Sequence, residues 1–135
     1  MSNEAPRRER PMSPFMIGPY YKPQLTSMLS ITHRGTGVFL TFGAFLLAAW
    51  LIGLANGKEA YDCVATCMAH PVGKLIVIGL VFSLVFHWLN GLRHLGWDVG
   101  WGFEIPKTYA TGWAVLVLSI VGTAGVLFLA FGGHP

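Results

Sequence analysis

The stretch that decides the fold is Leu75-Ile-Val-Ile-Gly-Leu-Val-Phe-Ser-Leu-Val-Phe86, which continues directly into His87-Trp-Leu-Asn-Gly-Leu-Arg-His94-Leu-Gly-Trp-Asp98. The first part carries no charge, as expected of a helix that crosses a membrane. His87 would therefore lie deep in an apolar helix, where an ionisable side chain is costly and usually marks a functional site. His87 and His94 are seven residues apart, so they share nearly one helix face at about 10 Å along the axis. This spacing suits one ligand held at two levels.

The composition extends this interpretation to the whole chain. Only 11% of the 135 residues are charged, whereas a soluble domain usually carries about 25%. Three stretches have no formal charge, namely 35–57, 75–92 and 108–133. Each meets or nearly meets the roughly 20 residues that a membrane-spanning helix needs, and none alternates in the manner of a barrel strand. These features predict an all-α membrane protein with three transmembrane helices.

The predicted organisation is an N-terminal segment, 1–26, followed by a three-helix membrane anchor, 27–135. The helices are expected at about 27–56, 71–98 and 107–132. No Lys or Arg follows Lys107, and most basic residues precede or begin the first helix: Arg7, Arg8, Arg10, Lys22 and Arg34. By the positive-inside rule, the N-terminus is cytoplasmic, or lies in the matrix of a mitochondrion, and the C-terminus is outside. The basic residues therefore follow the topology, and nothing in the net charge of +3 calls for a nucleic-acid partner.

The first 25 residues bear on the compartment. They contain neither the apolar core of a signal peptide nor the long Ser/Arg-rich pattern of a transit peptide. A bacterial inner membrane is therefore favoured, with the mitochondrial inner membrane as the alternative. Cys63 and Cys67, in the outer loop, do not form the C-x-x-C-H motif of covalently attached haem. Whether these two cysteines form a disulfide stays open.

A polar stripe opens the first helix. Ser27, Ser30 and Arg34 share one helix face, and His33 lies on its shoulder. In one interpretation Arg34 reaches lipid phosphate and the hydroxyls bond to their own helix. In the other, hydroxyl, imidazole and guanidinium converge on a carboxylate or a quinone carbonyl. Two glycines at 35 and 37 would let a neighbouring helix or a flat ring approach closely.

A second polar group surrounds His87. Gly91, one turn later, would leave a gap beside the imidazole of the kind that a porphyrin plane requires. Neutral imidazole is a common axial ligand of haem iron. Arg93 and His94, with His33 and Arg34, would offer positive charge and hydrogen-bond donors to the propionates. A hydrogen bond from His87 to a neighbouring helix is the simpler alternative.

These residues also carry a resemblance. Three motifs are similar to those of the cytochrome b556 subunit of succinate dehydrogenase, the large membrane anchor of respiratory complex II. They are Arg10-Pro-Met-Ser-Pro14, the run from Tyr21 to Gly37, and His87-x3-Gly91-x-Arg93-His94-Leu-x2-Asp98. The resemblance covers almost the whole chain, and the order and spacing of the motifs agree with it.

The resemblance implies roles for individual residues. It implies that His87 is an axial ligand of haem b, and that a small anchor subunit supplies the second ligand and completes the helical bundle. Ser30 and Arg34 match residues that line a ubiquinone pocket beside the iron–sulfur subunit. His33, Arg93 and His94 match positions near the haem propionates. The remaining cofactor-binding candidates are Ser27, Gly91 and Asp98, of which Asp98 has the least defined role.

The function implied is electron transfer from succinate to ubiquinone in the tricarboxylic acid cycle and respiratory chain. Succinate would be oxidised on a flavoprotein subunit, because this chain has neither a dinucleotide fingerprint nor an iron–sulfur cysteine set. Ser30 would hydrogen-bond a quinone carbonyl, and Arg34 would stabilise the negative charge that develops on the quinone oxygen. Two alternatives stay open: the cytochrome b anchor of a fumarate reductase, and a non-catalytic membrane assembly protein.

Overall fold

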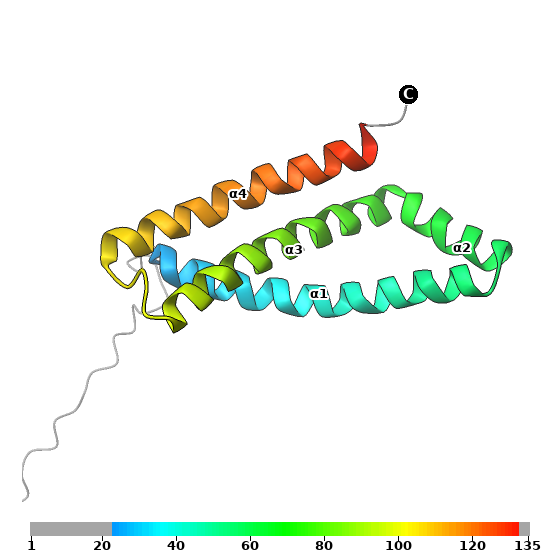
Figure 1. Cartoon of the computed structure of the whole chain (residues 1–135). Helices are drawn as coiled ribbons and strands as arrows, with labels where there is room; N and C mark the ends of the chain where they lie inside the picture. The colour runs from blue at the N-terminus through cyan, green and yellow to red at the C-terminus, as the bar shows by residue number, and fades with distance from the viewer. Residues whose placement is uncertain (1–22, 133–135) are drawn as a thin grey trace, which may run out of the picture.

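The computed structural model describes residues 23–132 as four helices (Figure 1). These are α1 (Leu25–Ala55), α2 (Lys58–Ala69), α3 (Pro71–Asp98) and α4 (Ile105–Phe131). Within the described range there is no strand. Three of the helices, α1, α3 and α4, are long and apolar enough to cross a membrane. The predicted all-α membrane fold is therefore confirmed. The basic residues 7, 8, 10 and 22, used to predict the topology, lie outside the described residues.

The helix α2 is an element that the charge-free stretches did not predict. At 12 residues it is too short to span a bilayer, and it carries both cysteines, exposed and unbridged. Gly57, which precedes it, has a φ of 98°, a left-handed conformation that favours glycine. His70 ends α2 and caps α3, since its Nδ1 accepts from the Val72 backbone N–H at 3.4 Å. Pro71 then occupies the first turn of α3, where its missing N–H has no cost.

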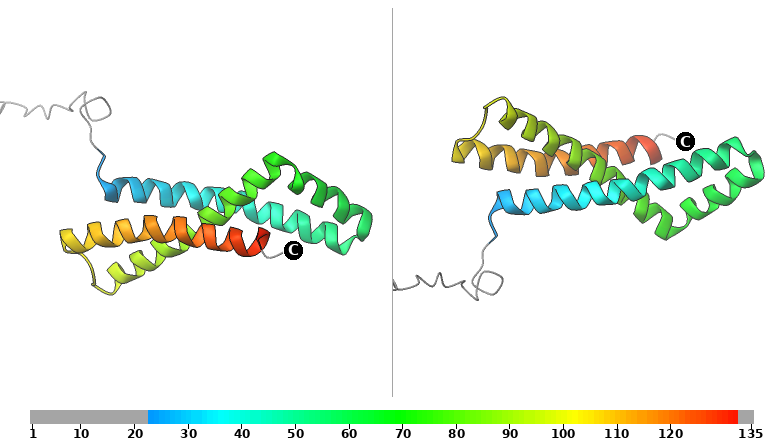
Figure 2. Two further views of the ribbon diagram at one scale, coloured as in Figure 1. Left: turned by 90° about the horizontal axis from the view of Figure 1, so that it is seen from above. Right: turned by 90° about the horizontal axis from the view of Figure 1, so that it is seen from below.

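The helix α3 runs antiparallel to both α1 and α4. The start of α1, the end of α3 and the start of α4 therefore lie at one end (Figure 1). Viewed from above and below, α3 crosses obliquely over the other two long helices (Figure 2). It contacts both α1 and α4 extensively, while α1 and α4 contact each other less. The helix α2 closes the far end between α1 and α3.

Small residues allow these close contacts. A Cβ on Gly112 of α4 would meet Leu29 of α1 at 2.9 Å, and one on Gly122 would meet Val85 of α3 at 3.1 Å. Ser119 and Thr123 are buried on the same face, and their hydroxyls donate to carbonyls of their own helix. Small residues on this face of α4 therefore allow close packing, whereas a Cβ on residue 125 would meet nothing within 4 Å.

One carbonyl in the turn between α3 and α4 accepts two side-chain hydrogen bonds. The Gly102 carbonyl accepts from Thr108 Oγ1 at 2.9 Å and from Trp97 Nε1 at 3.3 Å. Gly100 and Gly102 have φ values of 83° and 89°, which a side chain would strain. The turn therefore sets the position of α4 against the polar end of α3.

Candidate haem and quinone site

The predicted polar residues converge at the end of the bundle where α1 begins and α3 ends. A pocket of about 480 Å³ opens there between the two helices. From α1 its lining comprises Thr26, Ser27, Ser30, Ile31 and Arg34, and from α3 it comprises Arg93, His94 and Trp97. Ser30 is half-buried, whereas Ser27 and Arg34 are exposed at the mouth. Five of the nine predicted site residues thus share one pocket, although they come from two distant parts of the sequence.

Three histidines stack beside this pocket. The His33 ring lies 3.8 Å from the His87 ring, with 12° between their planes, and 5.3 Å from the His94 ring, with 18° between planes. His33 of α1 therefore lies against both histidines of α3. Stacked rings present their faces, not their nitrogen atoms, to one another. Within residues 23–132, no group of His, Cys, Asp or Glu side chains is arranged to hold a bare metal ion.

The environment of His87 determines which of its ring nitrogens carries the proton. Its Nδ1 lies 3.1 Å from the His33 carbonyl oxygen and 3.2 Å from Thr36 Oγ1. Because a carbonyl oxygen can only accept, Nδ1 of the neutral ring carries the proton and donates it. Nε2 then keeps its lone pair, which is the form of imidazole that binds iron.

The imidazole of His87 also fits closely against α1. A Cβ on Gly37 would lie 3.1 Å from His87 Cε1, so a larger residue there would press on the ring. The glycine that gives the imidazole its space is therefore Gly37, whereas a Cβ on Gly35 or Gly91 would meet nothing within 4 Å. The space beside Gly91 is open, and the role of Gly91 next to a porphyrin stays a prediction.

Arg93 is engaged by α4. Its Nη2 donates to the Thr108 carbonyl at 2.9 Å and its Nε donates to Thr111 Oγ1 at 3.1 Å. The guanidinium also lies 4.1 Å from the centre of the Trp97 ring, a cation–π contact. Because Arg has five N–H donors, these bonds leave donors free at the pocket while fixing the position of the side chain.

The other predicted residues have simpler surroundings. His94 Nδ1 lies 2.8 Å from the Asn90 carbonyl, which by the same reasoning leaves a lone pair on Nε2 of the neutral His94 ring, able to accept a hydrogen bond. Asp98 is exposed at the last position of α3 and does not line the pocket. Asn90 itself is fully buried, and its side-chain amide has no hydrogen-bond partner among the described residues.

Sequence reasoning missed Thr36. It is 8% exposed and contacts both His33 and His87. A signal was present, since a threonine hydroxyl in a helix bonds a carbonyl three or four residues earlier, and His33 is three residues earlier. The contact with His87, however, depends on the packing of two helices.

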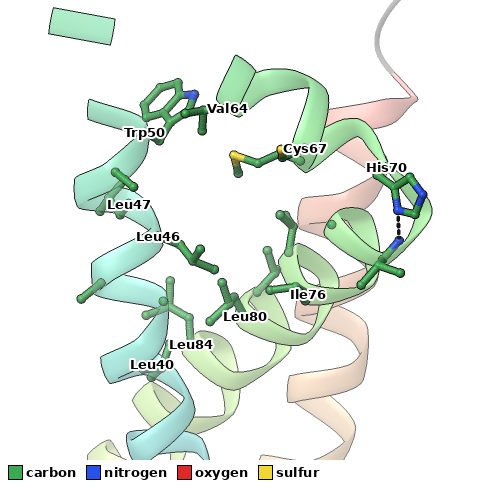
Figure 3. Close-up of a pocket in the computed structure, with 18 of the residues that line it drawn as sticks. Leu40, Leu46, Leu47, Trp50, Val64, Cys67, His70, Ile76, Leu80 and Leu84 are labelled. Atoms are coloured by element: carbon green, nitrogen blue, oxygen red, sulfur yellow. Dashed lines mark hydrogen bonds between the residues drawn. The ribbon is translucent and has the colours of Figure 1, made fainter. Parts of the chain in front are cut away.

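A second pocket, of about 1150 Å³, lies at the opposite end, where α1 and α3 diverge below α2. Figure 3 shows its lining, which is apolar apart from a few groups near α2 such as Cys67 and His70. Such a surface provides van der Waals contact but no groups for ligation or proton transfer on its apolar walls. The predicted site residues that share a pocket lie at the other end of the described bundle.

Comparison with known proteins agrees with this arrangement. Residues 6–126 match the family described as succinate dehydrogenase/fumarate reductase transmembrane subunit. The succinate dehydrogenase cytochrome b556 subunit of Rickettsia prowazekii (strain Madrid E) is 43% identical over 115 residues, which cover 85% of this chain and 88% of that protein. The human mitochondrial succinate dehydrogenase cytochrome b560 subunit is 37% identical over 119 residues, covering 87% and 69% respectively. The chain belongs to the family of succinate dehydrogenase and fumarate reductase transmembrane subunits, and it is similar to cytochrome b subunits within that family.

Proposed function

We propose that this chain is the cytochrome b anchor of a succinate:ubiquinone oxidoreductase. In this role it holds haem b through His87 and contributes Ser30 and Arg34 to a ubiquinone-reduction site. The observation that carries the proposal is the contact of His87 Nδ1 with the His33 carbonyl at 3.1 Å, which leaves Nε2 as a free iron ligand. The relatives at 43% and 37% identity are named as succinate dehydrogenase subunits, which favours this function over fumarate reduction.

Several residues of the chain would hold the haem. His87 would hold the iron through Nε2, and Arg93 would donate to an anionic propionate at the polar end of the same helices, where His94 and His33 also lie. When bound, haem b supplies a centre that accepts and releases one electron at a time. The neutral His87 ring has no proton on Nε2, so this nitrogen would bind the iron without a prior proton transfer.

A second axial ligand must come from elsewhere. His33 stacks on His87 at 3.8 Å, which leaves no room for a porphyrin plane between the two rings. His94 also stacks on His33, so we expect neither histidine to serve as the second ligand. A partner anchor subunit that supplies a histidine would satisfy this requirement. The bundle would then be completed by that subunit, with the iron–sulfur and flavoprotein subunits bound at the polar end.

The pocket at the polar end suits a quinone head group. Ser30 can donate its hydroxyl hydrogen to a quinone carbonyl, and Arg34 brings a fixed positive charge to the same mouth. A guanidinium does not give up its proton in proteins, so Arg34 would stabilise negative charge on the quinone oxygen without acting as the proton donor. Trp97 and Ile31 offer apolar surface for the ring.

The relatives also bear on location. The three long helices fit a multi-pass membrane protein, and relatives occur both in Rickettsia and in human mitochondria. We place the chain in a bacterial inner membrane, with the mitochondrial inner membrane as the alternative. The N-terminus and the polar pocket would lie on the cytoplasmic side.

His87→Ala tests the haem assignment. The assembled complex would be purified with and without the substitution and its reduced-minus-oxidised spectrum recorded. We expect the b-type α-band to be lost, because one of the two axial ligands is gone. His70→Asn is the matched control, since His70 is exposed at the opposite end and asparagine preserves the helix cap. Full haem content in the His87→Ala complex would refute the assignment.

A further inference from the structure

Thr36 lies where its hydroxyl can act on His87. The side chain is 8% exposed and comes from α1, one turn into the membrane from His33. Its Oγ1 donates to the His33 carbonyl at 2.9 Å and lies 3.2 Å from His87 Nδ1. The same His33 carbonyl lies 3.1 Å from His87 Nδ1. These three groups form a closed triangle between α1 and α3.

The proton count in this triangle admits one arrangement. The hydroxyl of Thr36 has one hydrogen, which it donates to the His33 carbonyl. The hydroxyl oxygen keeps lone pairs facing His87 Nδ1, and so does the carbonyl oxygen. If Nδ1 were unprotonated, its lone pair would face the carbonyl oxygen at 3.1 Å without a hydrogen between them. Nδ1–H therefore donates to two acceptors, and Thr36 is one of them.

We propose that Thr36 is a positioning residue that holds His87 in the tautomer with Nδ1 protonated and fixes the plane of its ring. Acceptors at Nδ1–H make the opposite nitrogen more basic and strengthen it as an iron ligand. A more basic ligand favours the oxidised iron, so Thr36 would keep the midpoint potential of the haem low. This inference rests on the proposed haem ligation by His87 and adds to it a residue that tunes the ligand.

The test uses the assembled complex with Thr36→Val and Thr36→Ser. Valine has nearly the shape of threonine and removes the acceptor, whereas serine keeps the hydroxyl. We expect Thr36→Val to raise the haem midpoint potential, to change the electron paramagnetic resonance signal of the ferric haem, and to lose haem about ten-fold faster to an acceptor protein. Thr36→Ser should restore the potential, the signal and the rate of haem loss of the unmodified complex.

Thr41→Val is the matched control. Thr41 is an exposed threonine on the same helix, and its hydroxyl bonds only to the Gly37 carbonyl among the described residues. The Thr41→Val variant should leave the haem midpoint potential and the rate of haem loss unchanged. Thr36→Ala, which removes the hydroxyl without placing a methyl group beside the ring, provides the same readouts where Thr36→Val fails to assemble.

The outcomes separate this inference from the proposed function. If His87→Ala removes the haem while Thr36→Val and Thr36→Ala keep the original potential and haem-loss rate, the role of Thr36 is wrong and the ligation stands. Equal shifts in Thr36→Ser and Thr36→Val would also overturn it, because packing of the methyl group would then be the cause. Haem retained in His87→Ala would instead refute the ligation itself.

Discussion

Ser30 is half-buried in the polar pocket, one turn before Arg34 on the same face of α1. Of the two serines of the stripe, it is the less exposed, because Ser27 lies at the outer mouth. A hydroxyl that is partly withdrawn from water can form a hydrogen bond to a ligand with less competition from solvent. Ser30 is therefore the serine that we propose as the donor to a quinone carbonyl.

Replacing Ser30 by alanine should lower succinate–ubiquinone reductase activity by roughly ten-fold, about the value of one hydrogen bond to the reacting group. Succinate oxidation with an artificial acceptor should stay unchanged, because that acceptor takes electrons before the quinone site. The haem spectrum should also persist. Thr41→Ala is the control, an exposed hydroxyl of the same helix outside the pocket. Unchanged activity with ubiquinone would show that Ser30 does not contact the quinone.

The corner between α2 and α3 depends on a glycine. Gly73 lies in the first turn of α3, against the last turns of α2. A Cβ there would overlap the Cys67 carbonyl oxygen and would lie 2.7 Å from the Met68 carbonyl oxygen. Both neighbours are backbone atoms, which cannot rotate away as a side-chain end can. The divergence of α1 and α3 under α2 therefore requires glycine at this position.

Gly73→Ala should lower the free energy of unfolding by about 1–3 kcal/mol, through overpacking against the backbone of α2. Gly125→Ala is the paired control, because a Cβ at Gly125 would meet nothing within 4 Å. Alanine is the better helix former, so Gly125→Ala should leave stability unchanged or raise it by up to about 1 kcal/mol. Denaturation of the purified complex in detergent, followed by circular dichroism, measures both. Equal stabilities of the two variants would contradict the packing argument.

The described part of the chain buries little of its own apolar surface. Leu29, Phe86 and Val115 are its buried hydrophobic residues, whereas large side chains such as Phe45 and Leu129 are at least 70% exposed. In a membrane such a surface faces lipid or another helix. The antiparallel helices also place α2 at the end opposite the polar pocket. The predicted orientation therefore puts α2, with both cysteines of the chain, outside the membrane.

A membrane-impermeant maleimide should label Cys63 and Cys67 from outside, in spheroplasts with an intact inner membrane. The control is a variant with both cysteines replaced by serine and the substitution Val99→Cys. Val99 is 81% exposed in the turn after α3, at the polar end. That variant should react only after the inner membrane is permeabilised. The reverse pattern of labelling would show that the N-terminus lies outside and would invert the proposed topology.

The three long helices could be predicted from the sequence alone, because charge-free stretches of sufficient length have few stable alternatives in a bilayer. It also predicted a set of polar site residues, since Ser30, Arg34, His87 and His94 stand out against an apolar background, and their roles stay predictions. The lengths of the connections already imply that consecutive long helices run antiparallel. This arrangement brings the polar residues together at one end. The ends of the helices were predicted to within two residues.

The surroundings of each group depend on how the helices pack, which the sequence did not reveal. The helix α2 was not predicted as an element, because its polar composition gives no membrane signal. The proton on His87 Nδ1, the role of Gly37 as the closest glycine, and the contact with Thr36 all depend on how α1 packs against α3. Helical periodicity tells which residues share a face of one helix, but the depth and rotation of a neighbouring helix come from side-chain packing over its whole length. The histidine that first suggested a ligand held at two levels proves to be oriented by a carbonyl and a hydroxyl of another helix.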